Sequence, residues 1–244
     1  MSAPGPPGAG PTVSVDLRRR DTAVLELMDD PACDEQALRR TYARFRTVNR
    51  LVAGWRRTYR ALLRPRLSTT RTTTLLDVGF GGGDLARALA GWARADGLRL
   101  LVDAVDPDPR ALAFVRDQPP TAGVRYRAAD TTGLVAEGEQ FDLVTSNHLL
   151  HHLGPDVLAR VLDESRRLGR ELVVHSDLRR SRAAYLGWSV AARPAARDSF
   201  LHTDGLRSIR RSYTPAELAA VVPDGWVVQP QLPFRLLLTW GAGG

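Results

Sequence analysis

The segment LLDVGFGGGDLA at positions 75–86 combines an acidic side chain with a cluster of glycines. Apolar residues lead into Asp77, glycines occupy positions 79, 81, 82 and 83, and a pattern typical of a helix follows directly. A strand, a glycine-rich turn and a helix N-terminus let a ligand approach the backbone closely and aim free N–H groups at it. A carboxylate at this turn favours a cationic amino-acid group over a pyrophosphate, because opposite charges attract.

Further polar side chains follow other apolar, strand-like runs. Asp106 and Pro107 come after LRLLVDAV, Asp130 and Thr131 come after VRYRAA, and Asn147 comes after FDLVTS. The ligands of open α/β sheets bind outside the carboxyl ends of the strands, near the point where the strand order reverses. If the ligand contains a ribose, Asp106 is therefore placed to accept hydrogen bonds from two of its hydroxyls.

Two of these stretches carry a family resemblance. The pattern D-x-G-x-G-x-G at 77–83 resembles motif I of the class I S-adenosylmethionine (SAM) methyltransferases. The stretch FDLVTSNHLLHHL at 141–153 is similar to motif IV of many small-molecule methyltransferases, roughly F-D-x-V-x-S-N-x-x-x-H-H. The resemblance implies SAM as the cofactor, with a binding site made of Asp77, Gly79, Gly81, Gly83, Asp106, Pro107, Asp130, Thr131 and Asn147.

The region before motif I resembles one subgroup of these methyltransferases. The stretch YARFRTVNRLVAGWRRTYR is loosely similar to the same region of the ubiquinone/menaquinone methyltransferases, with Tyr42, Asn49 and Trp55 at the matching positions. This implies a small, hydrophobic, hydroxylated aromatic acceptor of a phenolic, polyketide-like or quinone-like kind. We expect O-methylation, with C-methylation of a quinol ring as the alternative.

The histidines supply candidate general bases, because a phenol must lose its proton as it accepts a methyl group. His148 follows the predicted strand 141–146, and His175 ends the next one, so both are expected to reach the same edge of the sheet. These two are our candidate catalytic residues. His151 and His152 are adjacent and would point in different directions from a helix, which is poor spacing for a metal, and we expect no metal site.

The elements that must position these residues alternate along the chain. Strand patterns cover 74–78, 99–105, 124–128, 141–146, 171–175, 225–229 and 234–239. Helix patterns cover 84–95, 108–116, 155–167, 181–192 and 214–221. This alternation predicts an α/β fold with a doubly wound, mostly parallel sheet. The short link between the last two strands predicts a hairpin that places an antiparallel C-terminal strand in the sheet.

Three regions of the chain are expected. Residues 1–33 begin with a Pro/Gly/Ala-rich stretch and are predicted to be largely disordered. Residues 34–66 have apolar positions at three- and four-residue steps and form an N-terminal helical cover, with a break at Gly54. This cover either packs on the core or forms a lid over a substrate pocket. The SAM-binding domain spans 70–244, and its insert 177–213 is expected to cover the substrate.

Composition limits the partners and the location. The net charge is +7 and all 34 basic residues are Arg, which would suit nucleic acid. The arginines are spread along the chain without interleaved aromatic residues, so we expect a small-molecule aromatic partner and no nucleic acid. A single cysteine excludes an internal disulfide framework. The sequence has neither a membrane-spanning run nor a secretory signal, so we expect a cytoplasmic protein and leave its oligomeric state open.

Other functions are not excluded by the sequence. The segment 81–86 reads G-x-G-x-x-A and fits the relaxed dinucleotide fingerprint, which would suit an NAD-linked oxidoreductase. The positive charge would suit an RNA methyltransferase, although Ser-Asn-His at 146–148 replaces the N-P-P-Y-type motif of enzymes that methylate amino groups of bases. A protein that has the fold without catalysis is the non-enzyme alternative.

Overall fold

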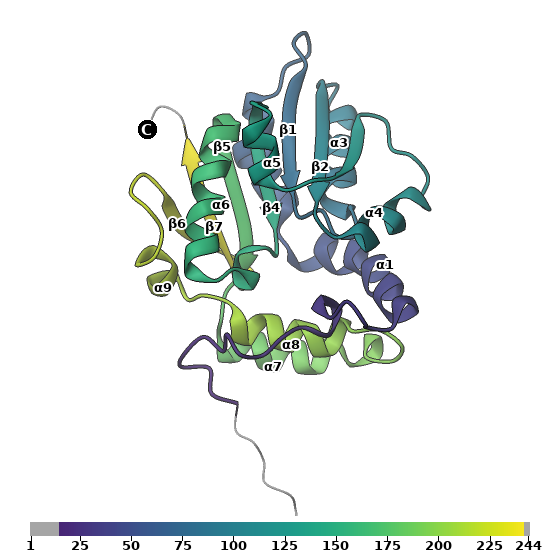
Figure 1. Ribbon diagram of the computed structural model, residues 1–244, viewed down its shortest axis with the longest axis vertical. Helices are drawn as coiled ribbons and strands as arrows, with labels where there is room; N and C mark the ends of the chain where they lie inside the picture. The colour runs from purple at the N-terminus through teal and green to yellow at the C-terminus, as the bar shows by residue number, and fades with distance from the viewer. Residues whose placement is uncertain (1–14, 242–244) are drawn as a thin grey trace, which may run out of the picture.

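The computed structural model describes residues 15–241, which are arranged around a seven-stranded sheet (Figure 1). Its strands are β1 (Thr73–Val78), β2 (Leu100–Asp106), β3 (Val124–Ala128), β4 (Phe141–Asn147), β5 (Gly169–Leu178), β6 (Val227–Gln231) and β7 (Arg235–Gly241). The strand order is β3-β2-β1-β4-β5-β7-β6, and β7 runs antiparallel to both of its neighbours. The predicted doubly wound sheet with an antiparallel C-terminal strand is confirmed.

Helices cover both faces of this sheet. They are α1 (Glu35–Val52), α2 (Trp55–Thr58), α3 (Asp84–Ala95), α4 (Pro109–Arg116), α5 (Thr131–Ala136), α6 (Pro155–Leu168), α7 (Arg182–Ala191), α8 (Leu201–Arg211) and α9 (Pro215–Ala219). A π-helical turn, η2 (Tyr59–Leu63), continues α2. Short 3₁₀ turns occur at η1 (Leu27–Asp29), η3 (Arg64–Arg66), η4 (Leu150–His152) and η5 (Arg193–Ala195).

The two faces of the sheet carry separate hydrophobic clusters. Successive side chains of a strand point to opposite faces, so Leu75 packs with residues of α1 to α4 while Leu76 packs with residues of α5, α6 and α9. Both residues are fully buried. Burial on both faces explains why the strands read as continuous apolar runs rather than alternating ones.

The N-terminal helices follow the predicted break. Gly54 has φ +70°, a conformation that favours glycine, and it separates α1 from α2. The side chain of Asp34 caps α1 by accepting a hydrogen bond from the N–H of Ala37 at 2.6 Å. Asn49 then ties α1 to the domain, since its Nδ2 donates to Asp84 Oδ2 at 3.0 Å.

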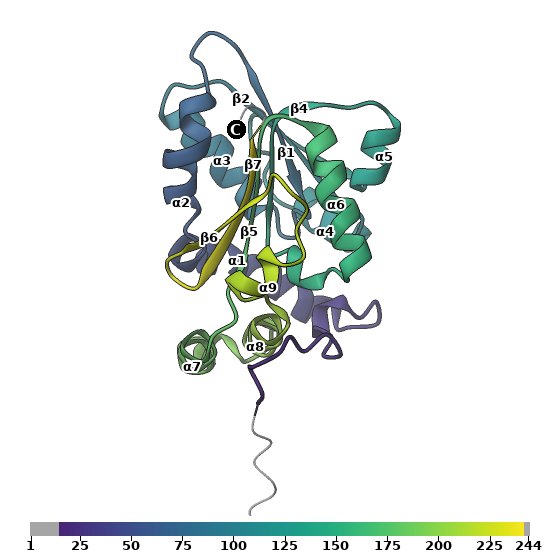
Figure 2. The same cartoon turned by 90° about the vertical axis from the view of Figure 1, so that its left-hand side faces the viewer.

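A layer made of α7 and α8 lies across the carboxyl ends of the parallel strands (Figures 1 and 2). The two helices approach closely at Gly205, where a Cβ atom would lie 2.1 Å from Trp188 Nε1. The expected insert 177–213 thus consists largely of this helical pair. Only the first of the two helices was predicted.

Residues 15–33 form an extended strap along α8 (Figure 1), which corrects our expectation of disorder as far as residue 33. Asp204 of α8 accepts hydrogen bonds from the N–H groups of Leu27 and Met28 at 2.7 and 3.0 Å. Arg211, at the end of α8, donates to the carbonyl of Val24 at 2.9 Å. The disorder predicted for residues 1–14 lies outside the described residues.

Among residues 15–241, no helix is long and apolar enough to cross a membrane.

Candidate active site

A cavity of about 680 Å³ lies where the turns after β1, β2 and β4 meet the layer of α7 and α8. This volume is typical of pockets that bind small molecules. Apolar and aromatic side chains make up much of its wall, among them Tyr42, Phe45, Val48, Leu85, Trp188, Leu201, Ile209 and Phe234. Helix α1 buries Leu38 and Tyr42 in the core and also lines the cavity with Phe45; its role as a lid over a substrate stays a prediction.

The glycine-rich turn follows β1 and borders this cavity. Gly79 and Gly81 have φ values of +72° and +50°, which a residue with a Cβ rarely adopts. The N–H of Gly81 donates to Asp106 Oδ2 at 2.8 Å, so the turn is fastened to the end of β2. Helix α3 begins at Asp84, and its first residues line the cavity.

Asp77 is the buried acid of this turn, with 1% of its surface exposed. Its Oδ1 accepts a hydrogen bond from Thr145 Oγ1 at 3.1 Å, since the two residues are paired across β1 and β4. Its Oδ2 has no hydrogen-bond partner among residues 15–241. Burial raises the pKa of this carboxyl to about 8. A lone buried carboxylate oxygen at a cavity wall suits a cationic donor such as an ammonium group.

Asp106 ends β2 and lines the same cavity beside Pro107. Its two oxygens accept from the N–H groups of Gly81, at 2.8 Å, and Asp108, at 2.9 Å. An ionised carboxylate offers about four acceptor positions, so two remain for the hydroxyls of a ligand. Burial raises the pKa of Asp106, and these backbone donors oppose that rise.

Three of the predicted cofactor residues do not line the cavity. A Cβ atom on Gly83 would lie 2.7 Å from Tyr126 Oη, so this glycine serves the packing of the turn. Asp130 is exposed and caps α5 through the N–H of Gly133 at 2.8 Å. Thr131 donates to Glu164 Oε2 at 2.5 Å and fastens α5 to α6. By contrast, Asn147 lines the cavity, and its contact with the cofactor stays a prediction.

His148 reaches the cavity, but its environment makes it a poor proton acceptor. Burial and the neighbouring Arg235 hold the pKa of His148 well below its usual value. Arg235 Nη1 lies 2.9 Å from His148 Nε2 and donates to it, so that lone pair is occupied. Arg235 also donates to Asn147 Oδ1 at 2.5 Å and Ser176 Oγ at 2.9 Å. Arg235 was not predicted from the sequence, because it starts an apolar strand far along the chain.

His175 does not meet our expectation of a second base. It is fully buried, its Nδ1 lies 2.7 Å from Ser146 Oγ, and its ring packs 5.5 Å from the ring of Trp226. Burial lowers its pKa to about 4. The strand β5 continues three residues beyond the predicted end, so this histidine lies inside the sheet rather than at its edge.

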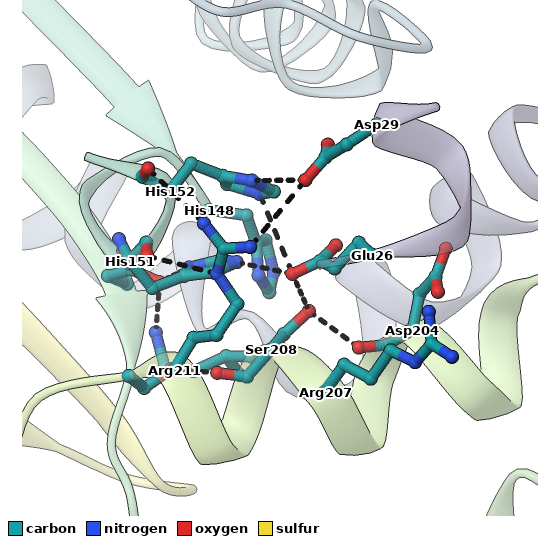
Figure 3. Close-up of polar contacts among 12 residues, drawn as sticks. Glu26, Asp29, His148, His151, His152, Asp204, Arg207, Ser208 and Arg211 are labelled. Carbon is teal, nitrogen blue, oxygen red and sulfur yellow. Dashed lines mark hydrogen bonds and ion pairs between the residues drawn. The ribbon is translucent and has the colours of Figure 1, made fainter. Parts of the chain in front are cut away.

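A third histidine, His151, forms a buried polar chain at the cavity wall (Figure 3). Its Nδ1 lies 2.7 Å from Asp177 Oδ1, and its Nε2 lies 3.1 Å from Glu26 Oε1. Burial disfavours the charged ring, but the two carboxylates outweigh that cost and raise the pKa of His151 to about 9. Glu26 also accepts from Ser208 Oγ at 2.7 Å, which joins the strap to α8 at this point.

His152 belongs to the same cluster. The two histidines were expected to diverge from a helix, but they lie on the 3₁₀ turn η4, with ring centroids 4.2 Å apart. The Nδ1 of His152 lies 3.2 Å from Asp29 Oδ2. The sequence did not point to Glu26 or Asp29, because both lie in the segment that composition predicted to be disordered.

Comparisons with known proteins find similarity to methyltransferases. Residues 75–171 match a family described as a methyltransferase domain. An 82-residue stretch is 35% identical to the ubiquinone biosynthesis O-methyltransferase of Methylobacterium sp. (strain 4-46). That match covers 33% of this chain and 30% of the length of the relative.

Solved structures share the fold at low sequence identity. The plantazolicin methyltransferase BpumL, in complex with a monoazolic desmethylPZN analog and SAH, has a TM-score of 0.53 and 11% identity over 82% of this chain and 83% of its own. Human N-acetylserotonin methyltransferase in complex with SAM has a TM-score of 0.59 and 11% identity over 86% of this chain and 57% of its own.

The fold and the family match define the class. The chain contains a methyltransferase domain and has the fold of the class I SAM-dependent methyltransferases. Within that class, its sequence is similar over a third of its length to an O-methyltransferase of ubiquinone biosynthesis.

Proposed function

We propose that this protein transfers the methyl group of SAM to an oxygen of a small, hydroxylated aromatic acceptor. The observation that carries the proposal is the unpartnered Oδ2 of Asp77, buried beside a glycine turn that opens on a largely apolar cavity. The relative in ubiquinone biosynthesis, which is named an O-methyltransferase, supports the same type of reaction.

The cofactor fits the residues at the strand ends. Asp77 would accept from the ammonium group of SAM, and the turn at Gly79 and Gly81 lets the amino-acid end approach the backbone. The two free acceptor positions of Asp106 would take the ribose hydroxyls. A pyrophosphate, as in NAD, would instead meet the buried carboxyl of Asp77, which argues against the oxidoreductase alternative.

The acceptor fits the remaining lining of the cavity. Phe45, Trp188 and Phe234 offer apolar surface for an aromatic ring, and the cluster of Glu26, His151 and His152 offers polar partners for its hydroxyl. Methyl transfer is a displacement that needs the acceptor oxygen in line with the methyl–sulfur bond and water kept out. The strap and the layer of α7 and α8 would supply that enclosure. Cytoplasmic location and the absence of a nucleic-acid partner stay predictions.

The test is methyl transfer from methyl-labelled SAM to a panel of phenols, catechols, dihydroxybenzoates and alkylresorcinols. We expect a product with one added methyl group on oxygen, identified by mass spectrometry and NMR. Asp106→Ala should lose the activity, whereas Asp117→Asn, which changes an exposed ion pair with Arg39, should keep it. A methyl group found on ring carbon, or label transferred to RNA and to none of the phenols, would contradict the proposal.

A further inference from the structure

We propose that Glu26, His151 and His152 bind a divalent metal ion at the cavity wall, of the class that prefers two histidines and one carboxylate, such as Zn²⁺, Co²⁺ or Fe²⁺. One donor atom from each residue lies within 4.8 Å of the other two. The three residues come from two separate parts of the chain, the strap and η4, and all three line the cavity.

The spacing of the donor atoms suits a tetrahedral ion. Glu26 Oε1 lies 3.1 Å from His151 Nε2 and 3.7 Å from His152 Nε2. Two ligands at about 2.0–2.1 Å from a tetrahedral zinc ion are about 3.3 Å apart. The donor atoms of the two histidines lie within 4.8 Å of each other, so side-chain rotations that narrow this gap would bring all three donors to bonding distance.

Both histidines have a carboxylate partner on the ring nitrogen that faces away from Glu26. Each ring presents its Nε2 toward Glu26 and has a carboxylate at its Nδ1, Asp177 for His151 at 2.7 Å and Asp29 for His152 at 3.2 Å. Metal-binding histidines almost always donate their second ring N–H to such a partner, which fixes the tautomer and orients the ring. The repetition of this arrangement at two adjacent histidines distinguishes the cluster from a single buried ion pair.

The surroundings hold the ligands in place (Figure 3). Arg211 donates to the carbonyls of His151 and His152, both at 3.3 Å, and so fixes η4. Ser208 donates to Glu26 at 2.7 Å and fixes the third ligand. Arg211 Nη1 also lies 3.8 Å from Asp29 Oδ2, the carboxylate that faces His152.

A metal ion at this place would have coordination positions facing the cavity. A hydroxyl oxygen of the acceptor could occupy one of them, where the ion would lower the pKa of the hydroxyl so that its proton leaves to water. The oxygen would then bond to the methyl group as the methyl–sulfur bond of SAM breaks and SAH leaves. This role rests on the proposed function. The binding of the ion itself does not, because it depends only on the three ligands and their partners.

The experiment titrates the full chain, freed of metal with a chelator, with Co²⁺ and then Zn²⁺. We expect one ion per chain by calorimetry, and visible absorption bands of tetrahedral Co²⁺ that disappear when Zn²⁺ replaces it. Glu26→Gln and His152→Ala should each weaken binding at least tenfold, and Asp177→Asn should weaken it about 10–100-fold. His202→Ala is the matched control, because its ring lies between α7 and α8, with Nε2 3.2 Å from the carbonyl of Ser189, and it should bind like the parent.

SAM binding by each metal-free variant tests whether the variant still folds, and it separates this inference from the proposed function. A chain that binds SAM but takes up neither ion would overturn the metal site and leave the proposed function standing. Equal metal binding by the parent and by His152→Ala, in variants that bind SAM, would overturn it too.

Discussion

Binding of SAM should release a proton from Asp77. The pKa of this carboxyl is about 8 in the free protein because burial penalises its charge, so roughly 90% of it is protonated at pH 7. An ammonium group against Oδ2 lowers a carboxyl pKa by about 1–3. The complex would then have a pKa between roughly 5 and 7, and between roughly 0.4 and 0.9 proton would leave Asp77 on binding.

Calorimetry at pH 7 measures this number directly. The heat of SAM binding is recorded in phosphate and in Tris, and its dependence on the ionisation enthalpy of the buffer gives the protons released. The α-amino group of SAM takes up roughly 0.1 proton in the opposite direction, since such groups have a pKa of about 7.7–8.0. Asp77→Asn isolates that contribution, because it removes the carboxyl. Equal proton release by the parent and by Asp77→Asn would refute the assignment of the ammonium site.

Four further outcomes are expected. Asp77→Asn should also flatten the pH dependence of stability, because a raised carboxyl pKa makes ionisation oppose folding from about pH 4 to about pH 8. In chemical unfolding, the free energy of unfolding of the parent should fall by up to about 1.4 kcal/mol for each pH unit of increase in that window, and that of the variant should fall less. Asp106→Ala should lower SAM affinity at least tenfold in calorimetry, because it removes two hydrogen bonds to a charged group worth roughly 1.5–3 kcal/mol each; unchanged affinity would contradict the ribose site. Gly205→Ala should lower the free energy of unfolding by about 1–3 kcal/mol in chemical unfolding, because the added methyl group would push α7 away from α8. Adding Trp188→Ala to the same chain should restore much of that stability, and additive losses from the two changes would argue against this contact. His175→Ala should cost about 1–3 kcal/mol by leaving its buried serine partner without a hydrogen bond, yet keep the parent pH profile of methyl transfer; a changed profile would restore His175 as a base.

The sheet, and the polar residues at the end of the cavity that we propose binds SAM, were predictable because their determinants are local. Helix α3 has the predicted bounds 84–95, since a glycine turn precedes it and an apolar period runs through it. The helix predicted to begin at 214 is likewise found there, since Thr214 caps α9 and forms a capping box with Glu217. Asp77 and Asp106 were found because a polar residue at the end of an apolar strand run must lie at the ligand-binding edge of a parallel sheet.

The end of the cavity that we propose binds the methyl acceptor was not predictable, because it is assembled from contacts between distant parts of the chain. Glu26 reaches His151 across 125 residues, from a segment without apolar periodicity. Arg235 reaches His148 only because the C-terminal hairpin inserts β7 beside β5. Helix α5 was missed for a different reason: its six residues are too few to show a helical period, and Gly133 interrupts them.

The proposed function requires above all that the glycine turn and the cavity beside it bind SAM. Calorimetric titration of the purified chain with SAM, and separately with NADH, tests it most directly. We predict that one SAM binds per chain, that S-adenosylhomocysteine (SAH) displaces it, and that Asp77→Asn weakens it. Binding of NADH without binding of SAM would contradict the claim.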